Sequence, residues 1–536
     1  MSFMKLDDCK SIAEVIERNT SVKAEEFVPF VLLSEKEPFI KNLKEAVELI
    51  LNNKGKSFHL VGDYDTDGVC ATAIMEAGLR RVGIHASTRL PKRFSEGYGL
   101  SKKIIDEIDS GVIITVDNGI AAYDAIKAAK EKGLIVIVTD HHLAPENENG
   151  VQIFPPADII VDPAVENESE FHAYCGAAVA YRIVKELAPA FDMTSLMILA
   201  SIATVADVMP LVGANRKLVI DGLKAVNSGK GVTGLRVLLQ KIKLTSHITE
   251  DDYGFKLGPI FNASGRLFDA GAEKTLALLM ARPTEAKIPW MADELIRNNE
   301  QRKKVFSESM VIAEKLIDRK SIRQRKPIVI YHPEWGEGII GLIAGEYCER
   351  YKLPTVVFTR THNGKLKGSA RSTTEVHLKN ALDCIQDKMI GYGGHAGAAG
   401  LSIEPEMFDS FKAAFTESCG KLKSIPKDFF YDLELDIDKI QEICDELEEF
   451  APFGEGNPKI RFLVKGITIE KYREIRDNTG FLGEGKGMTI VGFDLAKKYA
   501  KLGYPKEIDC VGSLKESWFN GKKSYKLEIM DLDASF

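Results

Sequence analysis

Short apolar runs rich in β-branched residues alternate with helical patterns in the first third of the chain. The runs are SFHLVG (57–62), VIITV (112–116), LIVIVT (134–139) and DIIVD (158–162). A helical stretch from Gly68 to Val82 follows the first run. Apolar strands that alternate with helices are typical of a parallel sheet covered on both faces. The pattern therefore predicts βαβ units and an α/β fold.

The pattern changes further along the chain. The polar, basic segment 293–326 has the composition of a connector helix. A second α/β segment follows it and ends in the glycine-rich GYGGHAGAAG (391–400). After about residue 425, short strands separated by turn residues predict a small β-barrel or sandwich. The expected divisions are a first domain over 1–292 with an N-terminal extension over 1–50, a connector helix over 293–326, a second domain over 327–424 and a β-domain over 425–536.

Composition narrows the classes of protein that fit this pattern. Of 536 residues, 45% are apolar and 28% are charged, as in ordinary globular proteins. The net charge of −7 excludes a globally basic nucleic-acid coat but leaves room for a local basic groove. The eight cysteines form no C-x-x-C pair, and no apolar stretch reaches the roughly 18 residues that a membrane helix needs. We therefore expect a multidomain cytoplasmic protein with reduced thiols and no membrane segment.

Acidic and histidine side chains follow the predicted strands and one apolar helix of the first domain. They occur in the motifs GDYDTDG, VDNG, TDHH and ATVADVMP. The residues are Asp63, Asp65, Asp67, Asp117, Asp140, His141, His142 and Asp207. Because the carboxyl ends of parallel strands meet at one edge of a sheet, we expect these side chains to converge on one crevice.

Such a cluster suits divalent cations. Carboxylates that lie close together repel one another unless cations compensate their charge. Oxygen ligands with one or two imidazoles favour Mn²⁺ or Mg²⁺, and two such ions about 3.5–4 Å apart are typical of phosphoester hydrolysis. An aspartate after a strand is also a common helix N-cap, so Asp117 taken alone fits either role. The four motifs together predict a two-metal phosphoesterase centre.

The four motifs resemble those of the DHH phosphoesterase superfamily, and the chain is similar in particular to the RecJ single-stranded-DNA exonucleases. Further segments that carry this resemblance are RFSEGYGL (93–100), GPIFNASGRL (258–267), GSARS (368–372), GGHAGAAGL (393–401) and APFGEGNP (451–458). The resemblance implies a parallel-sheet DHH domain, a smaller α/β DHH-associated domain joined to it by a long helix, and a C-terminal OB-type β-barrel. It also implies 5′→3′ hydrolysis of single-stranded DNA to mononucleotides with Mn²⁺ or Mg²⁺, in DNA repair or recombination.

The resemblance also assigns roles at the metal centre. The implied metal ligands are Asp63, Asp65, Asp117, His141 and Asp207. His142 and Asp140 are assigned to catalysis: His142 contacts the scissile phosphate or orients the water, and Asp140, like Asp67, fixes the geometry of a ligand. His59 matches a metal-binding histidine of relatives outside the RecJ group, but on a strand it fits a hydrogen-bonded core residue equally well.

A second set of positions resembles the substrate contacts of the family. Guanidinium groups bind phosphate bidentately and stay charged, which suits a pocket for a 5′-terminal phosphate. The positions that match this pocket are Arg93, Arg266, Ser369 and Arg371. Glycines let backbone N–H groups approach phosphate closely. The positions that match the family's substrate loop are Gly393, Gly394 and His395.

The β-domain places aromatic residues among lysines, a combination that binds single strands with little sequence preference. Trp518 and Phe519, beside a predicted Asn520-Gly521 turn, are the aromatics most expected at the surface. Single-stranded DNA is the predicted ligand, and a helicase or single-strand-binding protein is a candidate partner. Two alternatives remain: a phosphodiesterase for short RNA or cyclic dinucleotides, and a replication scaffold without catalysis. The β-domain disfavours the first, and the complete ligand set disfavours the second.

Overall fold

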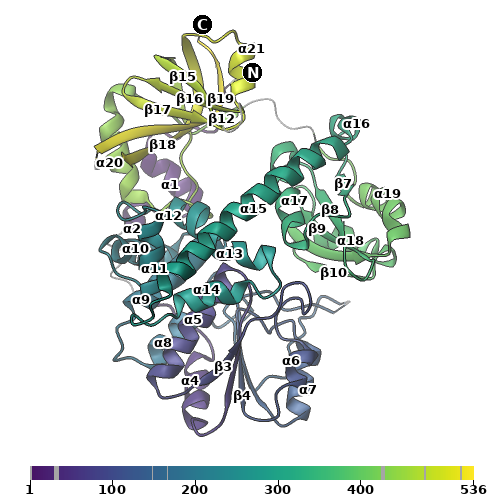
Figure 1. Ribbon diagram of the computed structural model, residues 1–536. Helices are drawn as coiled ribbons and strands as arrows, with labels where there is room; N and C mark the ends of the chain where they lie inside the picture. Colours follow the sequence, from purple (N-terminus) through teal and green to yellow (C-terminus); the bar gives the residue numbers. More distant parts are fainter. Residues whose placement is uncertain are drawn as a thin grey trace.

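The computed structural model describes residues 3–28, 36–147, 149–165, 167–423, 429–475, 479–519 and 522–535. Figure 1 shows a parallel sheet with its helices at the bottom, a smaller α/β domain on the right and a β-domain at the top. The long helix α15 (Ile288–Leu316) crosses between these parts. No helix in the described ranges is long and apolar enough to cross a bilayer.

The four apolar runs of the first domain all form strands of one parallel sheet, as predicted. They are β2 (Phe58–Val61), β4 (Val112–Val116), β5 (Ile135–Thr139) and β6 (Ile159–Val161). A fifth strand, β3 (Ala86–Arg89), pairs with β2 at the edge of the sheet, in the order β3-β2-β4-β5-β6. All of these pairings are parallel, so the carboxyl ends of the strands share one edge.

Helices cover both faces of this sheet, which is why its central strands are apolar throughout. Ile114 packs with the helices of one face, and Ile113 packs with those of the other, because strand residues alternate. The helices on the first face are α4 (Leu43–Asn52), α5 (Thr66–Arg81) and α8 (Gly176–Leu187). Those on the second are α6 (Lys102–Asp106) and α7 (Tyr123–Glu131).

A run of helices completes the first domain. They are α9 (Thr194–Ala206), α10 (Gly213–Asn227), α11 (Thr233–Lys241), α12 (Glu250–Asp252), the π-helix η1 (Tyr253–Leu257), α13 (Gly258–Leu267) and α14 (Ala272–Leu279). The connector helix expected over 293–326 differs at both ends. It begins at Ile288, where Pro289 is tolerated in the first turn, and ends at Leu316. Asp318 then caps a separate short helix, α16 (Arg319–Arg323).

The second domain is a five-stranded sheet in the order β10-β11-β9-β8-β7. Its strands are β7 (Ile328–Tyr331), β8 (Thr355–Arg360), β9 (Leu366–Arg371), β10 (Gly391–Gly394) and β11 (Ala398–Ile403). Its helices are α17 (Glu337–Tyr351), α18 (Leu378–Asp383) and α19 (Phe408–Ser418). The glycine-rich segment expected as a substrate loop is largely a hairpin, in which Gly393 of β10 pairs with Gly400 of β11.

The β-domain is one mixed sheet in the order β13-β14-β18-β19-β17-β16-β15. Its strands are β13 (Leu433–Glu434), β14 (Phe462–Thr468), β15 (Lys471–Ile475), β16 (Gly480–Gly485), β17 (Met488–Gly492), β18 (Glu507–Phe519) and β19 (Lys522–Ala534). Two helices, α20 (Ile440–Phe450) and α21 (Ala496–Lys501), accompany them. In the part of the chain that the structure describes, the edge strands β13 and β15 do not pair with each other.

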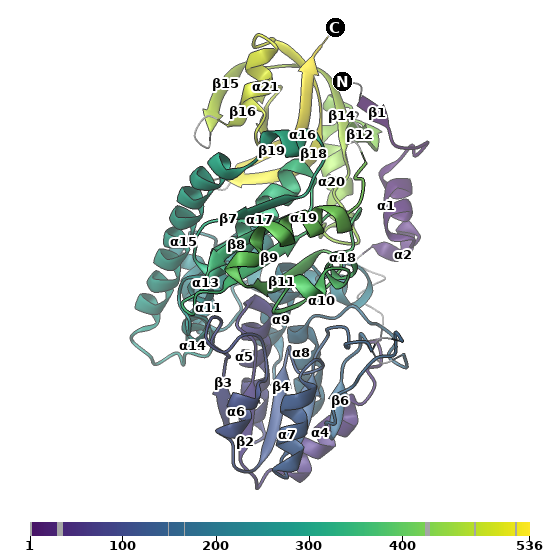
Figure 2. The same ribbon diagram turned by 90° about the vertical axis from the view of Figure 1, so that its right-hand side faces the viewer.

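The N-terminal residues had been expected to extend the first domain. The structure instead places them with the β-domain. Strand β1 (Phe3–Lys5) pairs in parallel with β12 (Phe429–Tyr431). Helices α1 (Ile12–Thr20) and α2 (Ala24–Phe27) bury their apolar sides in the core of the β-domain. Figure 2 shows α1 and α2 beneath β1, along the side of this domain.

Arg216 of α10 joins the first domain to the β-domain. Its fully buried guanidinium donates hydrogen bonds to the carbonyl oxygens of Phe27 (3.3 Å), Phe450 (2.9 Å) and Pro452 (3.4 Å). Two of these residues lie at or just beyond the C-terminal end of α20, where the helix dipole favours a cation. Burial lowers the pKa of Arg216 to about 10, so the group stays charged at neutral pH.

We expect Arg216→Ala to loosen the docking of the β-domain. The substitution leaves buried carbonyls without a donor and opens a cavity, at a cost of about 3 kcal/mol. Hydrogen exchange at the amides of α20 should become markedly faster than in Arg236→Ala, which removes an exposed arginine from the neighbouring helix α11. Identical exchange in the two variants would show that Arg216 does not hold the domains together.

Candidate metal centre and phosphate pocket

The carboxyl edge of the parallel sheet gathers the acidic and histidine side chains. Asp63 follows β2, Asp117 follows β4, and His141 follows β5. Asp207 comes from the end of α9, which reaches the same edge. Three overlapping sets have ligand atoms within 4.8 Å of one another: Asp63, Asp65 and Asp117; Asp67, His141 and Asp207; and Asp117, His141 and His142. The side chains that the sequence predicted to converge therefore lie together.

The backbone around Asp117 is built for close approach. Asp117 has a left-handed backbone with φ +62°, a conformation that aspartate tolerates better than most residues. A Cβ atom at Gly176 would lie 2.5 Å from Asp117 Oδ1, so only glycine lets α8 begin against this carboxylate. Asp117 is not a helix cap, because α7 begins at Tyr123 with Ala122 at its N-cap. The cap interpretation applies instead to Asp65, whose Oδ1 accepts the N–H of Gly68 at 3.0 Å.

Asp67 holds the start of α8 beside the cluster. Its two carboxylate oxygens accept the backbone N–H groups of Gly176 at 2.7 Å and Ala177 at 2.8 Å. The side chain is buried, and Oδ2 lies 3.6 Å from His141 Nε2. The position fits the predicted role in fixing the geometry of a ligand.

The electrostatics of the cluster call for a cation. Burial raises the pKa values of Asp63, Asp117 and Asp207 well above their usual range, and neighbouring carboxylates raise them further. The Oδ1 atoms of Asp63 and Asp117 are buried without a hydrogen-bond donor among the described residues. Burial and the positive charge of His142 lower the pKa of His141, so its ring is neutral. Nε2 of that ring lies 3.1 Å from Asp117 Oδ1. A divalent ion fits this set of oxygens with one imidazole.

Asp140 and His142 form a separate ion pair at the rim. Asp140 Oδ1 lies 2.7 Å from His142 Nδ1, and Asp140 Oδ2 accepts the N–H of Ile120 at 2.9 Å. Burial opposes the charge on His142, but the hydrogen bond and the charge of Asp140 outweigh it and raise the pKa of His142 to about 9. His142 is therefore a cation at neutral pH. Asp140 contacts the ring and an adjacent backbone N–H, and its predicted role stays a prediction.

Tyr98 is a neighbour of the cluster that the sequence analysis did not single out. Its hydroxyl donates to the carbonyl oxygen of Asp117 at 3.0 Å and lies 3.2 Å from His142 Nδ1. Tyr98 lies in RFSEGYGL, a segment whose resemblance to the family could have indicated a role for it. His59, in contrast, lies toward the other end of β2, where its Nε2 is 3.1 Å from the carbonyl oxygen of Ser110. This favours the hydrogen-bonded alternative for His59 over a metal ligand.

A cluster of arginines adjoins the metal centre. Arg371 Nη1 donates to Ser369 Oγ at 3.1 Å on β9, and Arg93 lies over the Tyr64 ring, 4.5 Å from its centroid. Arg266 is half-buried, and desolvation followed by the charges of Arg93, Arg371 and Arg302 lowers its pKa to about 9. In the described ranges none of these four arginines forms an ion pair with a carboxylate. Half-buried guanidinium groups without a carboxylate partner suit a multiply charged anion such as a terminal phosphate.

Arg302 of α15 is the member of this cluster that the sequence did not reveal. In the sequence, Arg302 is one of many basic residues in the segment that was predicted to be a connector helix. Its guanidinium donates to Asn299 Oδ1 at 3.0 and 3.2 Å, and burial lowers its pKa. An i, i+3 pair of this kind is ordinary on a helix surface, so the local pattern gave no reason to select it.

The glycine-rich hairpin of the second domain faces the metal centre. His395 follows β10, and the positive charge of His142 adds to desolvation in lowering its pKa. Gly393 and Gly394 lie in β10, so their backbone N–H groups belong to a hairpin edge rather than to an open loop. The predicted substrate residues of the second domain therefore lie across from the DHH motif.

The aromatic residues of the β-domain are not a free stacking surface. The Trp518 ring stacks on His247 of the first domain, with centroids 4.0 Å apart and planes at 4°. Phe481 is fully buried in the core of the β-domain. Lys515 forms ion pairs with Asp251 and Glu528. Trp518 is exposed, as predicted, but one face of its ring is covered by the first domain. The side chain of Phe519 and the Asn520-Gly521 turn lie outside the described residues.

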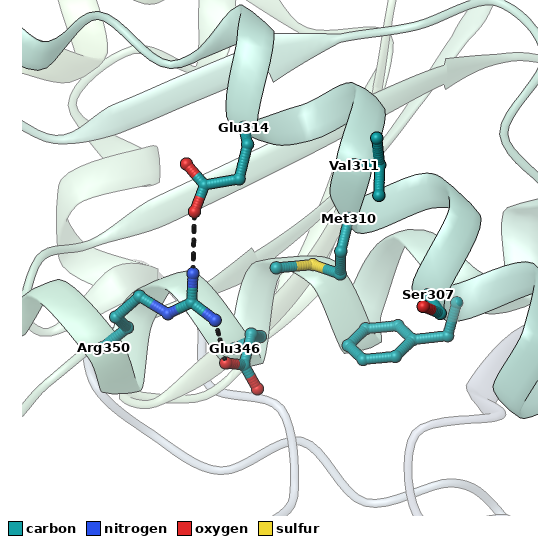
Figure 3. A pocket seen from close by; sticks show the side chains of 7 residues that line it. Ser307, Met310, Val311, Glu314, Glu346 and Arg350 are labelled. Atoms are coloured by element: carbon teal, nitrogen blue, oxygen red, sulfur yellow. Dashed lines mark hydrogen bonds and ion pairs between the residues drawn. The ribbon is translucent and has the colours of Figure 1, made fainter. Parts of the chain in front are cut away.

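A pocket of about 320 Å³ lies elsewhere, between α15 and α17 (Figure 3). Met310 and Val311 line it, and Arg350, which also lines it, bonds to Glu314 and Glu346 at 2.8 Å each. The acidic rim is already paired, and none of the predicted site residues lines this pocket. The candidate chemistry therefore stays with the carboxylate and arginine clusters.

Comparison with known proteins supports the three-part division. Family profiles match residues 57–206 (DHH family, N-terminal domain), 324–421 (DHHA1 domain) and 431–531 (RecJ OB domain). These matches confirm the expected DHH, DHH-associated and OB domains.

The most informative relatives are bacterial exonucleases. The chain is 30% identical to the single-stranded-DNA-specific exonuclease RecJ of Salmonella typhimurium, over 92% of this chain and 90% of that protein. It is 33% identical to the corresponding RecJ of Escherichia coli, over 70% of this chain and 69% of that protein. The fold is similar to the crystal structure of RecJ in complex with Mn²⁺ from Thermus thermophilus, with a TM-score of 0.80 and 27% identity over all of this chain and 80% of that one.

Proposed function

The chain belongs to the RecJ family of single-stranded-DNA-specific exonucleases. From this membership we propose that it hydrolyses single-stranded DNA from the 5′ end, with Mn²⁺ or Mg²⁺ as cofactor, and releases mononucleotides. The observation that carries the proposal is the adjacency of two sites. Arg93 lies over the ring of Tyr64, and Tyr64 stands between Asp63 and Asp65 of the carboxylate cluster. A terminal phosphate held by the arginines therefore places a nearby phosphodiester bond at the carboxylates.

The residues of the DHH motifs have different roles at the cluster. The chain would hold two ions through Asp63, Asp65, Asp117, His141 and Asp207. When bound, these ions lower the pKa of an attacking water and neutralise charge on the phosphate. The cationic ring of His142 contacts a non-bridging oxygen of the scissile phosphate, and Asp140 keeps the ring charged and oriented. Asp67 keeps α8 against the cluster.

The arginine cluster accounts for polarity. A 5′-terminal phosphate carries more charge than an internal phosphodiester, so a pocket with several half-buried guanidinium groups prefers the end of a strand. Ser369 and Arg371 come from the second domain, and Arg93 and Arg266 come from the first. The pocket therefore forms only where the two domains meet across α15. A helicase or single-strand-binding protein as partner stays a prediction.

We expect Arg371→Ala to weaken the preference for a 5′-phosphate over a 5′-hydroxyl end by about 10- to 100-fold, since charge-assisted hydrogen bonds contribute about 1.5–3 kcal/mol. The measurement compares kcat/KM for the two kinds of oligonucleotide. Arg360→Ala, which removes an exposed arginine from β8 of the same sheet, should keep the wild-type ratio. An unchanged ratio in Arg371→Ala would reject the assignment of Arg371 to the terminal phosphate.

One assay tests the proposed function against its alternative. The protein with Mn²⁺ is given 5′-phosphorylated single-stranded DNA labelled at either end, the matching duplex, and a cyclic dinucleotide. We expect mononucleotides to appear first from the 5′-labelled end of the single strand, with little product from the duplex. Hydrolysis of the dinucleotide alone would favour the phosphodiesterase alternative.

A further inference from the structure

Phe255 is an exposed aromatic side chain in a segment that is otherwise packed. It is 80% exposed, whereas Tyr253 and Leu257 of the same π-helix are fully buried. A π-helix inserts one extra residue into helical geometry, and such insertions are frequent at functional sites. Exposure of a large aromatic ring costs hydration free energy without a return in packing. The ring forms no part of the carboxylate cluster or of the arginine cluster.

The π-helix η1 touches the metal centre at its C-terminal end. Thr66, which lies between Asp65 and Asp67, donates its hydroxyl to the carbonyl oxygen of Gly258 at 3.1 Å. A Cβ atom at Gly258 would lie 3.2 Å from the Cβ of Ala206, the residue before Asp207. Phe255 precedes Gly258 by three residues, which is about one helical turn, or roughly 5 Å of rise. Phe255 is therefore about one helical turn from the residue that contacts Thr66 and Ala206 beside the carboxylate cluster.

The segment before η1 touches the β-domain. Glu250 of α12 accepts the backbone N–H of Phe453 at 3.1 Å. Asp251 forms ion pairs with Lys459 at 2.8 Å and Lys515 at 2.9 Å. Figure 1 shows α12 directly below the β-domain and α13 toward the middle of the molecule. The ring of Phe255 thus lies on the segment that leads from the β-domain to the metal centre.

We propose that Phe255 stacks on a base of the DNA strand on the 3′ side of the scissile phosphate, between the metal centre and the β-domain. The inference rests on the proposed function, because it needs a single strand with its 5′ end in the arginine cluster. An aromatic face binds any base, which suits an enzyme that must advance along every sequence. Lys256, next in the sequence, forms an ion pair with Asp252 at 2.6 Å. We therefore expect this segment to contact the DNA through the ring of Phe255 and not through a lysine–phosphate contact.

The test is a scan with abasic residues. A set of 5′-phosphorylated single strands carries one abasic residue at successive positions from the 5′ end, and KM is measured for the wild type, Phe255→Ala and Phe255→Tyr. We expect one position at which the abasic residue raises KM of the wild type about fivefold or more. In Phe255→Ala this position should no longer matter, because the ring is already gone, while Phe255→Tyr should behave as the wild type.

A second readout separates stacking from charge. The KM of Phe255→Ala for intact strands should rise by the same factor, with the same dependence on salt concentration as the wild type, since no phosphate contact is lost. Tyr123→Ala, which removes an exposed aromatic ring from α7, should leave both KM and the abasic profile unchanged.

Each outcome bears on a different claim. Wild-type and Phe255→Ala profiles that coincide, or a salt dependence that flattens in the variant, would overturn the stacking role of Phe255 and leave the exonuclease proposal intact. A wild type that does not cleave single strands at all would instead contradict the proposed function itself.

Discussion

Asp117→Asn should abolish cleavage of single-stranded DNA while the strand still binds. Asp117 belongs to two of the three sets of candidate ligands, so its loss disturbs both expected ion positions. The carboxamide is neutral and is a poorer ligand for Mn²⁺ or Mg²⁺. Asparagine also tolerates the left-handed backbone at this position, which alanine does not. We expect kcat to fall by about 10³-fold or more, in line with the removal of a group that stabilises developing charge.

The stability of the metal-free protein provides a control for this variant. The pKa of Asp117 is raised in the folded chain, so the folded state binds protons that the unfolded state has released. Stability without metal is therefore present at low pH and is lost as the pH rises through the raised pKa. Asp117→Asn should unfold later than the wild type at pH 8 in chelator, although it is inactive. Asp124→Asn, an exposed neighbour in α7, should change neither property, and retained turnover in Asp117→Asn would exclude Asp117 from the metal centre.

Asp140→Asn should lower kcat/KM at pH 8 by about 10- to 100-fold, the usual cost of losing a group that orients a catalytic residue. In the wild type Asp140 raises the pKa of His142 to about 9, so the ring stays cationic across neutral pH. Without that carboxylate, burial is opposed only by the more distant charges of Asp207 and Asp67, so the pKa of the ring falls. A smaller fraction of the ring would then be cationic at pH 8.

The pH profile of activity tests this account. We expect the wild type to lose the contribution of His142 only above about pH 9, and Asp140→Asn to lose it at a lower pH. The variant should therefore be least impaired at pH 6 and most impaired at pH 8. Asp124→Asn again serves as the control. Parallel profiles in the wild type and Asp140→Asn would mean that His142 does not act as a cation.

The sequence predicted the strands that are buried on both faces and missed those that are not. The runs at β2, β4, β5 and β6 are apolar because helices cover both faces of the sheet. Strand β3, with the sequence ASTR, lies at an edge and carries no such run. The pairing of β1 with β12 joins residues more than 400 positions apart, and no local pattern reports such a contact.

Among the site residues, those marked by a local sequence pattern could be predicted, and those placed by long-range packing could not. Asp63, Asp117 and His141 could be predicted because each directly follows an apolar strand whose direction is known. Arg302 could not, because it comes near Arg266 only through the packing of α15 against the first domain. Trp518 was predicted to be exposed from its turn, and its side chain is 40% exposed, but its stacking on His247 of the first domain was not predicted. Turn chemistry reports the local backbone and not the neighbouring domain.

The most direct test of the account is a crystal structure of the protein grown with Mn²⁺, with anomalous scattering used to locate the ions. The account predicts two manganese ions at the carboxyl edge of the parallel sheet, held by Asp63, Asp65, Asp117, His141 and Asp207. The same crystals of Asp117→Asn should show weakened or absent peaks. Wild-type crystals in which these side chains hold no manganese would contradict the claim that this cluster is a metal-dependent nuclease centre.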